Sequence, residues 1–124
     1  MDIGAWREFN SYVPAGGKIL DASRATGLGA TSDLRLVSLP REEYDAVWAH
    51  ESLFGYKADE CRRAMATFFL TLKPRGILFV SFEENEEFHA DDYASLVRQH
   101  GFTLISSGRD ARYPERVAFI ARRI

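Results

Sequence analysis

Apolar residues recur every three or four positions in three segments of the chain, which is the spacing of an amphipathic helix. The clearest stripe lies in residues 57–73 and consists of Ala58, Cys61, Met65, Phe68 and Leu72. This segment is predicted to be a helix that ends at Pro74. Two further helices are expected, over residues 3–13 and from a cap at Asp91 or Asp92 to His100.

Shorter apolar runs predict β-strands, and six of them are found at residues 18–22, 34–39, 44–49, 77–82, 102–107 and 117–121. The last two flank a polar stretch and predict a closing hairpin. Helices and strands mostly alternate along the chain, which predicts an α/β fold: a mixed, largely parallel sheet with helices on both faces and a C-terminal antiparallel hairpin. Because there is no internal repeat and no linker, residues 1–124 are expected to form a single domain.

Composition and charge exclude several classes of partner and compartment. The apolar fraction of 46% and the charged fraction of 27% are those of an ordinary globular protein. The formal net charge is −2 and the basic residues are dispersed, so nucleic acid is not an expected partner. The single cysteine, Cys61, fits a reducing compartment. No apolar run is long enough for a signal core or a membrane span, so a cytoplasmic protein without membrane contact is expected.

Three segments combine strand character with chemically distinctive residues. The first predicted strand ends in the carboxylate of Asp21 and leads into Ala22-Ser23-Arg24-Ala25-Thr26-Gly27. The second segment reads Tyr44-Asp45-Ala46-Val47-Trp48-Ala49-His50-Glu51-Ser52-Leu53-Phe54-Gly55-Tyr56. The third reads Leu70-Thr71-Leu72-Lys73-Pro74-Arg75-Gly76-Ile77-Leu78-Phe79-Val80-Ser81-Phe82.

In this order the three segments resemble the class I S-adenosylmethionine-dependent methyltransferases, especially small bacterial members that act on small molecules. The family patterns are V-L-D/E-x-G-x-G-x-G, F/Y-D-A-V-W-A-x-x-x-L-x-H and L-K-P-G-G-x-L-x-x-S. The resemblance implies a Rossmann-like sheet with S-adenosylmethionine as the cofactor of an active protein. It also implies that the cofactor-binding positions are Asp21, Gly27, Trp48, Ala49 and His50.

The sequence departs from the family at its glycines and in its spacing. Ser23, Ala25 and Arg75 stand where the family has glycine, and side chains in the first loop fill space that backbone amides need to reach a ligand. Only residues 28–43 separate this loop from the second segment, where the family has a second strand, a third strand and their helices. The second strand normally supplies the carboxylate that holds the ribose. Nearby candidates to replace that carboxylate are Asp33, Glu42 and Glu43.

Three functions follow as alternatives. The favoured one is a pseudoenzyme: a non-catalytic binding or subunit module that has lost standard S-adenosylmethionine binding, with a homodimer or a protein partner covering the sheet edge left by the missing strands. The second is a minimal S-adenosylmethionine-dependent methyltransferase acting on a small molecule. The third uses His50 or Glu51 as a general base, His50 being otherwise a polar residue at a strand end.

Two further expectations concern metals and surface charge. A metal is not expected, because no set of His, Cys and carboxylate residues has the spacing of a metal site. The acidic run 83–87 is expected to be a solvated loop that can pair with arginines of the last hairpin, namely Arg109, Arg112 and Arg116.

Overall fold

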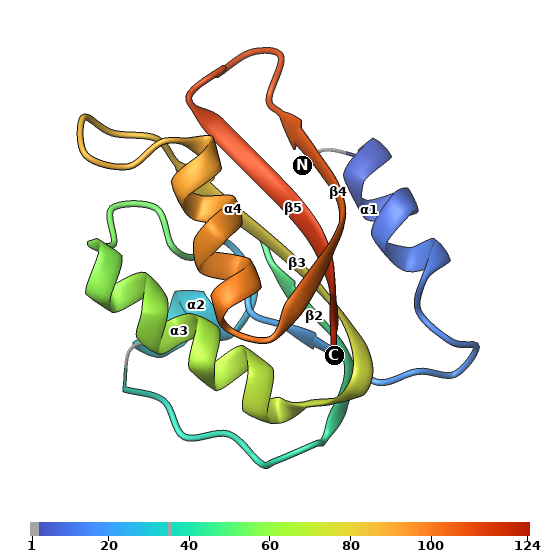
Figure 1. The fold of residues 1–124 in the computed structure, drawn as a ribbon. Coiled ribbons are helices and arrows are strands. Elements are labelled where there is room, and N and C mark those ends of the chain that lie inside the picture. The colour runs from blue at the N-terminus through green and yellow to red at the C-terminus, as the bar shows by residue number, and fades with distance from the viewer. Residues whose placement is uncertain (1–2, 35) are drawn as a thin grey trace.

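The computed structural model describes residues 3–34 and 36–124, and their strands form a five-stranded mixed sheet of order β1-β2-β3-β5-β4 (Figure 1). The strands are β1 (Ile19–Asp21), β2 (Tyr44–Ala49), β3 (Leu72–Glu83), β4 (Phe102–Arg109) and β5 (Arg116–Arg123). The first three run parallel, and β5 is antiparallel to both β3 and β4. This confirms the predicted mixed sheet and its C-terminal hairpin.

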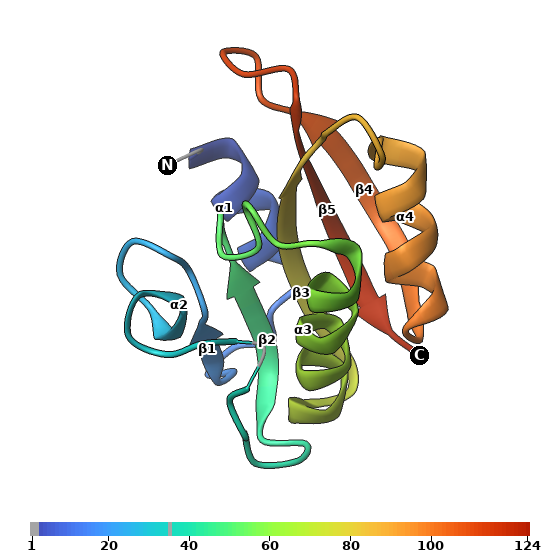
Figure 2. The same cartoon turned by 90° about the vertical axis from the view of Figure 1, so that its left-hand side faces the viewer.

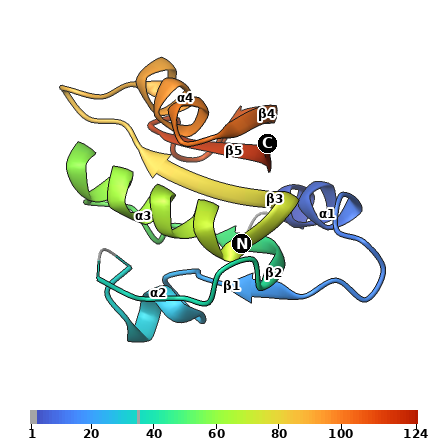
Figure 3. The ribbon, with the colours of Figure 1, turned by 60° about the horizontal axis from the view of Figure 1, so that its bottom comes forward.

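The helices lie on both faces of the sheet, as predicted. Figures 1 and 2 show α1 (Ile3–Ser11) on one face and α3 (Ala58–Thr71) with α4 (Ala90–Gln99) on the other. The four residues of α2 (Leu28–Thr31) make a single turn beside β1 at the edge of the sheet (Figure 3). None of the described helices combines the length and the apolarity that crossing a membrane requires.

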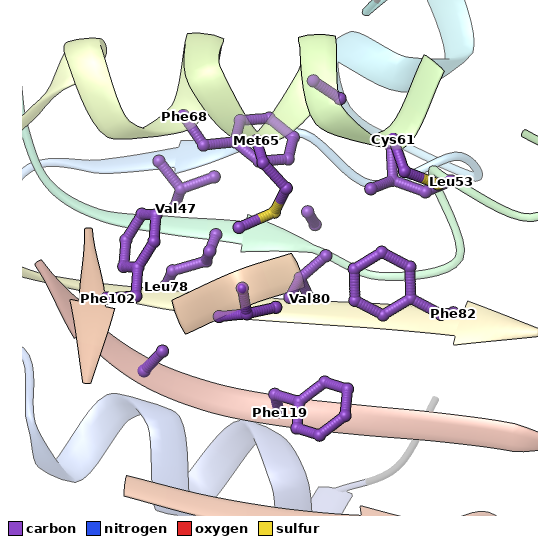
Figure 4. Close-up of a cluster of buried hydrophobic side chains, with 14 of the residues drawn as sticks. Val47, Leu53, Cys61, Met65, Phe68, Leu78, Val80, Phe82, Phe102 and Phe119 are labelled. Carbon is purple, nitrogen blue, oxygen red and sulfur yellow. The ribbon is translucent and has the colours of Figure 1, made fainter. Parts of the chain in front are cut away.

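The larger apolar core lies between the sheet and the pair α3 and α4. Phe68 and Met65 of α3 pack toward Leu78 and Val80 of β3, because alternate side chains of a strand point to the same face (Figure 4). Cys61 is buried in this core. Burial, with the nearby Glu60 charge, raises the pKa of its thiol to about 12, so the thiol stays protonated at neutral pH and acts as a packing group.

The smaller core, between the sheet and α1, is aromatic. The Trp48 ring of β2 stacks on Phe79 of β3 with 4.0 Å between ring centroids. Trp6 and Phe9 of α1 meet the same indole at 4.9 and 5.1 Å. A single helix therefore covers β2 and β3 on this face through a few large rings.

The strand predicted at residues 34–39 is wrong. Leu34 is 1% exposed and Leu36 is 77% exposed, but the amides of Leu36 and Val37 both donate to the Asp33 carbonyl, which makes a turn. Arg35 lies outside the described residues. Further on, the Pro40 carbonyl accepts a hydrogen bond from Thr71 Oγ1 at 2.6 Å. The backbone of this segment therefore bonds to itself and to the end of α3, and its Leu34 and Val37 side chains pack on the α3 core.

Two predicted boundaries are also corrected. The third strand begins at Leu72 instead of residue 77, because the chain bulges between the β2–β3 pairs Tyr44–Leu72 and Ala46–Ile77. The last helix begins at Ala90. The amide of the preceding residue, His89, donates to Asp92 Oδ2 at 2.9 Å, so Asp92 stabilises the start of the helix from its first turn.

Candidate functional site

The carboxylate of Asp21, at the end of β1, is turned onto its own loop. Its Oδ1 accepts from the Ser23 amide at 2.9 Å and its Oδ2 accepts from Thr26 Oγ1 at 3.1 Å. Partial burial works to raise the pKa of this carboxyl, but the hydrogen bonds from Ser23 and Thr26 outweigh it and hold the pKa below its usual range. Asp21 is therefore ionised at neutral pH and already bonded within the loop.

The amides of the same loop are largely used inside the protein. Those of Ala22 and Arg24 donate to carbonyls at the end of β2, those of Trp48 and His50. The amides of Ser23, Gly27 and Ala30 donate within the loop and its following turn. Five amides between residues 22 and 30 thus have internal acceptors, and α2 is too short to present a helix N-terminus to a ligand.

Gly27 is needed for close packing. Its φ is −112°, which any residue can adopt, but a β-carbon there would overlap with the carbonyl oxygen and Oδ1 of Asp21. Among described non-glycine residues, positive φ is limited to Glu42, Glu51 and Arg75. Ser23 and Ala25, which stand where the family has glycine, therefore have negative φ angles. The loop conformation is one that residues with a β-carbon adopt without strain.

The structure separates the five residues for which the sequence predicts cofactor contacts. Asp21, Gly27 and His50 gather where β1 and β2 end, since the carboxyl ends of parallel strands meet at one edge. Trp48 is 3% exposed in the α1 core, and Ala49 is fully buried in the opposite core. Both side chains of this pair are thus enclosed by protein.

Two of the three carboxylates suggested for the ribose, those of Glu42 and Glu43, lie elsewhere. Glu43 pairs with Lys18, and both residues precede their strands, at the amino end of the sheet. Glu42 precedes Glu43 in the sequence and lies 3.8 Å from Arg123 Nη1, at the end of β5. Because β1 and β2 run parallel, these groups are at the opposite end from Asp21 and His50. Glu42 and Glu43 therefore do not take the place of the missing ribose carboxylate.

A cavity of about 420 Å³ opens on the α1 face of the sheet, next to the end of β2. Its apolar surface comes from Phe79, Ala118 and Ile120 on β3 and β5, and from Phe54. Its polar side chains come from α1, β3, β4, β5 and the loops after β2 and β4, and they are Glu8, His50, Glu51, Ser81, Ser106, Ser107, Arg109, Asp110 and Arg116. A concave, mainly apolar space with convergent polar groups is the usual form of a small-molecule site.

Glu51 organises the wall of this cavity. Its backbone is left-handed, with φ of 62°, and its amide donates to the buried Ser81 Oγ at 2.7 Å. Its carboxylate accepts from Arg116 Nη1 at 3.2 Å and lies 3.9 Å from His50 Nδ1. The His50 ring stacks on Trp48 at 5.8 Å between centroids. The cavity wall therefore holds a carboxylate, an imidazole and a guanidinium in contact.

The predicted pairing of the hairpin with the acidic run is confirmed for two of three arginines. Arg109 bonds to Glu84, and Arg116 Nε lies 3.6 Å from Glu83 Oε2. Arg112 makes no ion pair with the residues that the structure describes. Arg116 also lies against Tyr113 and Phe54, at 4.2 and 5.1 Å from the ring centroids. The sequence suggested Glu51 as a base, but it gave no sign that Arg116, 65 residues later, would meet it.

The fold is shared with many solved methyltransferases. A TehB-like S-adenosylmethionine-dependent methyltransferase from Corynebacterium glutamicum superposes with a TM-score of 0.75 at 15% identity, over 99% of this chain and 89% of that one. The Burkholderia thailandensis 1,6-didemethyltoxoflavin-N1-methyltransferase, solved with 1,6-didemethyltoxoflavin and S-adenosylhomocysteine, has a TM-score of 0.70 at 16% identity, over 98% and 79%. No protein-family model matches the sequence, and a search of curated proteins finds no match.

Other neighbours are considerably longer than the part that matches. The chain covers 42% of a possible exported protein from Bordetella parapertussis, with a TM-score of 0.60 at 16% identity over 74% of its own length. It covers 58% of a Haloferax volcanii protein solved as a complex of the Trm112 methyltransferase activator with a presumed methyltransferase, with a TM-score of 0.59 at 15% identity over 73% of its own length. These identities describe a shared fold.

Proposed function

Because the chain has the fold of class I S-adenosylmethionine-dependent methyltransferases, we propose that it is a methyltransferase-like, non-catalytic binding or subunit module that has lost standard S-adenosylmethionine binding. The observation that carries this proposal is the closed loop after β1. Asp21 and five loop amides already have partners inside the protein. A ligand group that bonds to Asp21 would have to replace its bonds from Ser23 and Thr26, and a hydrogen bond to a charged group contributes about 1.5–3 kcal/mol.

A subunit role also follows from the edge of the sheet. β1 is a three-residue strand that pairs with β2 on one side only among the described residues. We propose that a second copy of the chain or another protein covers this edge, since unpaired strand edges favour association. The Haloferax complex supports a protein partner by analogy. Light scattering tests this proposal: a strict monomer at high concentration would contradict a homodimer.

The alternative is a minimal S-adenosylmethionine-dependent methyltransferase for a small molecule. One observation favours it: His50 connects the two parts of the site, because its carbonyl accepts from the Arg24 amide while its ring lines the cavity. The Burkholderia neighbour binds both a small heterocycle and S-adenosylhomocysteine. A cytoplasmic location and a single domain over residues 1–124 stay predictions from the sequence.

Calorimetric titration with S-adenosylmethionine and S-adenosylhomocysteine separates the two functions. We expect no binding heat at millimolar ligand. A Kd in the micromolar range, about −8 kcal/mol, would contradict the proposal and favour the enzyme.

The Ser23→Gly/Ala25→Gly variant should be titrated in parallel. It should also show no binding heat, because it keeps the internal bonds of Asp21 and gains no carboxylate for the ribose. Binding by this variant alone would locate the loss of affinity in the two side chains. Circular dichroism before each titration shows that the variant is folded.

A further inference from the structure

The cavity on the α1 face has the size and lining of a site for one small organic molecule. Its volume of about 420 Å³ lies within the usual range for such sites. Its lining includes the half-buried ring of Phe54 and the ring of Phe79, which is 3% exposed, and Ala118 leaves room above β5 because its side chain is short. The cavity does not depend on the loop after β1, so its ligand can be considered apart from S-adenosylmethionine.

The cavity lining holds three carboxylates and two guanidinium groups. The carboxylates belong to Glu8, Glu51 and Asp110, and the guanidinium groups to Arg109 and Arg116. Arg109 already bonds to Glu84, and Arg116 lies between Glu51 and Glu83. The carboxylate of Glu8, on α1, makes no ion pair with any residue that the structure describes. The field at the mouth therefore favours a positive charge.

Glu51 is held in place at a conformational cost. Its left-handed φ of 62° is one that a β-carbon disfavours and glycine adopts freely. The bond from its amide to Ser81 Oγ fixes this geometry, and its side chain is 33% exposed where the cavity opens. Strained non-glycine residues cluster at functional sites. The geometry thus directs one carboxylate to the cavity at a position where glycine would fold more easily.

We propose that this cavity binds a small aromatic amine in its cationic form, with Glu51 as the main counter-ion, Glu8 adding negative charge at the mouth, and the ring lying against Phe79 and Phe54. The inference rests on the proposed binding function and adds the chemical class of the ligand. A charge-assisted hydrogen bond to a carboxylate is stronger than a neutral one and selects an ammonium group over a hydroxyl or a carboxylate.

Three indoles of matched size test the assignment: tryptamine, which is cationic at pH 7, tryptophol, which is neutral, and indole-3-acetate, which is anionic. Calorimetry at low salt should show tryptamine binding at least tenfold more tightly than either of the others. Added salt should narrow this difference, because the mouth is open to solvent.

Variants of the two carboxylates sharpen the test. Glu51→Gln should weaken tryptamine about tenfold, in line with the loss of a hydrogen bond to a charged group. It should also raise the affinity for indole-3-acetate, since Arg116 then has Glu83 as its remaining ion-pair partner. Glu8→Gln should weaken tryptamine about threefold. Glu86→Gln, on the exposed loop and outside the cavity, is the matched control and should change nothing.

Glu51→Gly keeps the test valid if Glu51→Gln folds poorly. It removes the carboxylate and relieves the left-handed strain, so it should be at least as stable as the wild type while losing the preference for tryptamine. Equal binding of the three indoles, or a preference for the neutral or anionic one, would overturn the cation assignment and leave the binding function standing. No binding of any indole up to millimolar would overturn this cavity as an aromatic-ligand site. The S-adenosylmethionine titration separately decides the proposed loss of the cofactor.

Discussion

The loop after β1 and the cavity beside β3, β5 and β4 differ in how their polar groups are used. Beside β1, Asp21 and five amides of its loop have hydrogen-bond partners inside the protein. Beside β3, β5 and β4, the carboxylate of Glu51 and the ring of His50 line an open cavity. The comparison teaches that a strand ending in a carboxylate does not by itself make an open ligand site, so function has to be argued from the site.

The largest expected effect tests whether the loop after β1 is closed. A β-carbon in Gly27→Ala would overlap with two oxygens of Asp21, one of them a backbone atom that cannot move alone. We expect a loss of about 2–3 kcal/mol in the free energy of unfolding, as for overpacked sites. Denaturant unfolding measures it as a lower midpoint at unchanged slope.

Gly108→Ala, on the open side of the sheet, is the matched control. Nothing lies within 4 Å of a β-carbon built there, so its free energy of unfolding should stay within about 0.5 kcal/mol of the wild type. If both variants were equally stable, the loop after β1 could open at little cost. A cofactor could then enter this loop at little cost, which would favour the enzyme.

The sequence predicts the framework well where hydrophobic spacing and packing agree. The helix stripe through Met65 and Phe68 and the strand face with Leu78 and Val80 meet in the same core. Residues 34–39 have the same apolar character, but Leu34 and Val37 pack on that core from a turn. The apolar character of a short run alone does not distinguish such a turn from a strand.

The candidate site could be predicted only in its local part. The family motif points to Asp21, Gly27 and His50, and the structure brings these three together. The contact between Glu51 and Arg116 depends on the antiparallel register of β3 with β5, in which Glu83 faces Arg116. The aromatic contacts of Trp48 likewise depend on where α1 docks. Such contacts follow from tertiary geometry, and a single sequence does not encode them in any local pattern.

The smallest effect concerns a second place where this chain lacks a glycine of the family. Unlike Ser23 and Ala25, Arg75 keeps the left-handed backbone, with φ of 69°, inside the bulge between β2 and β3. Arg75→Gly should therefore stabilise the protein by about 0.5 kcal/mol, because relief of about 1–2 kcal/mol of strain is partly offset by the greater freedom of glycine in the unfolded chain. The bond from Arg122 Nη1 goes to the Arg75 carbonyl and is kept. The same substitution at exposed Arg63, inside α3, should lower the free energy of unfolding by about 1 kcal/mol. Changes of opposite sign in the two variants, measured by denaturant unfolding, would support backbone strain at Arg75. A loss of stability in both variants would mean that the Arg75 side chain itself supports the bulge.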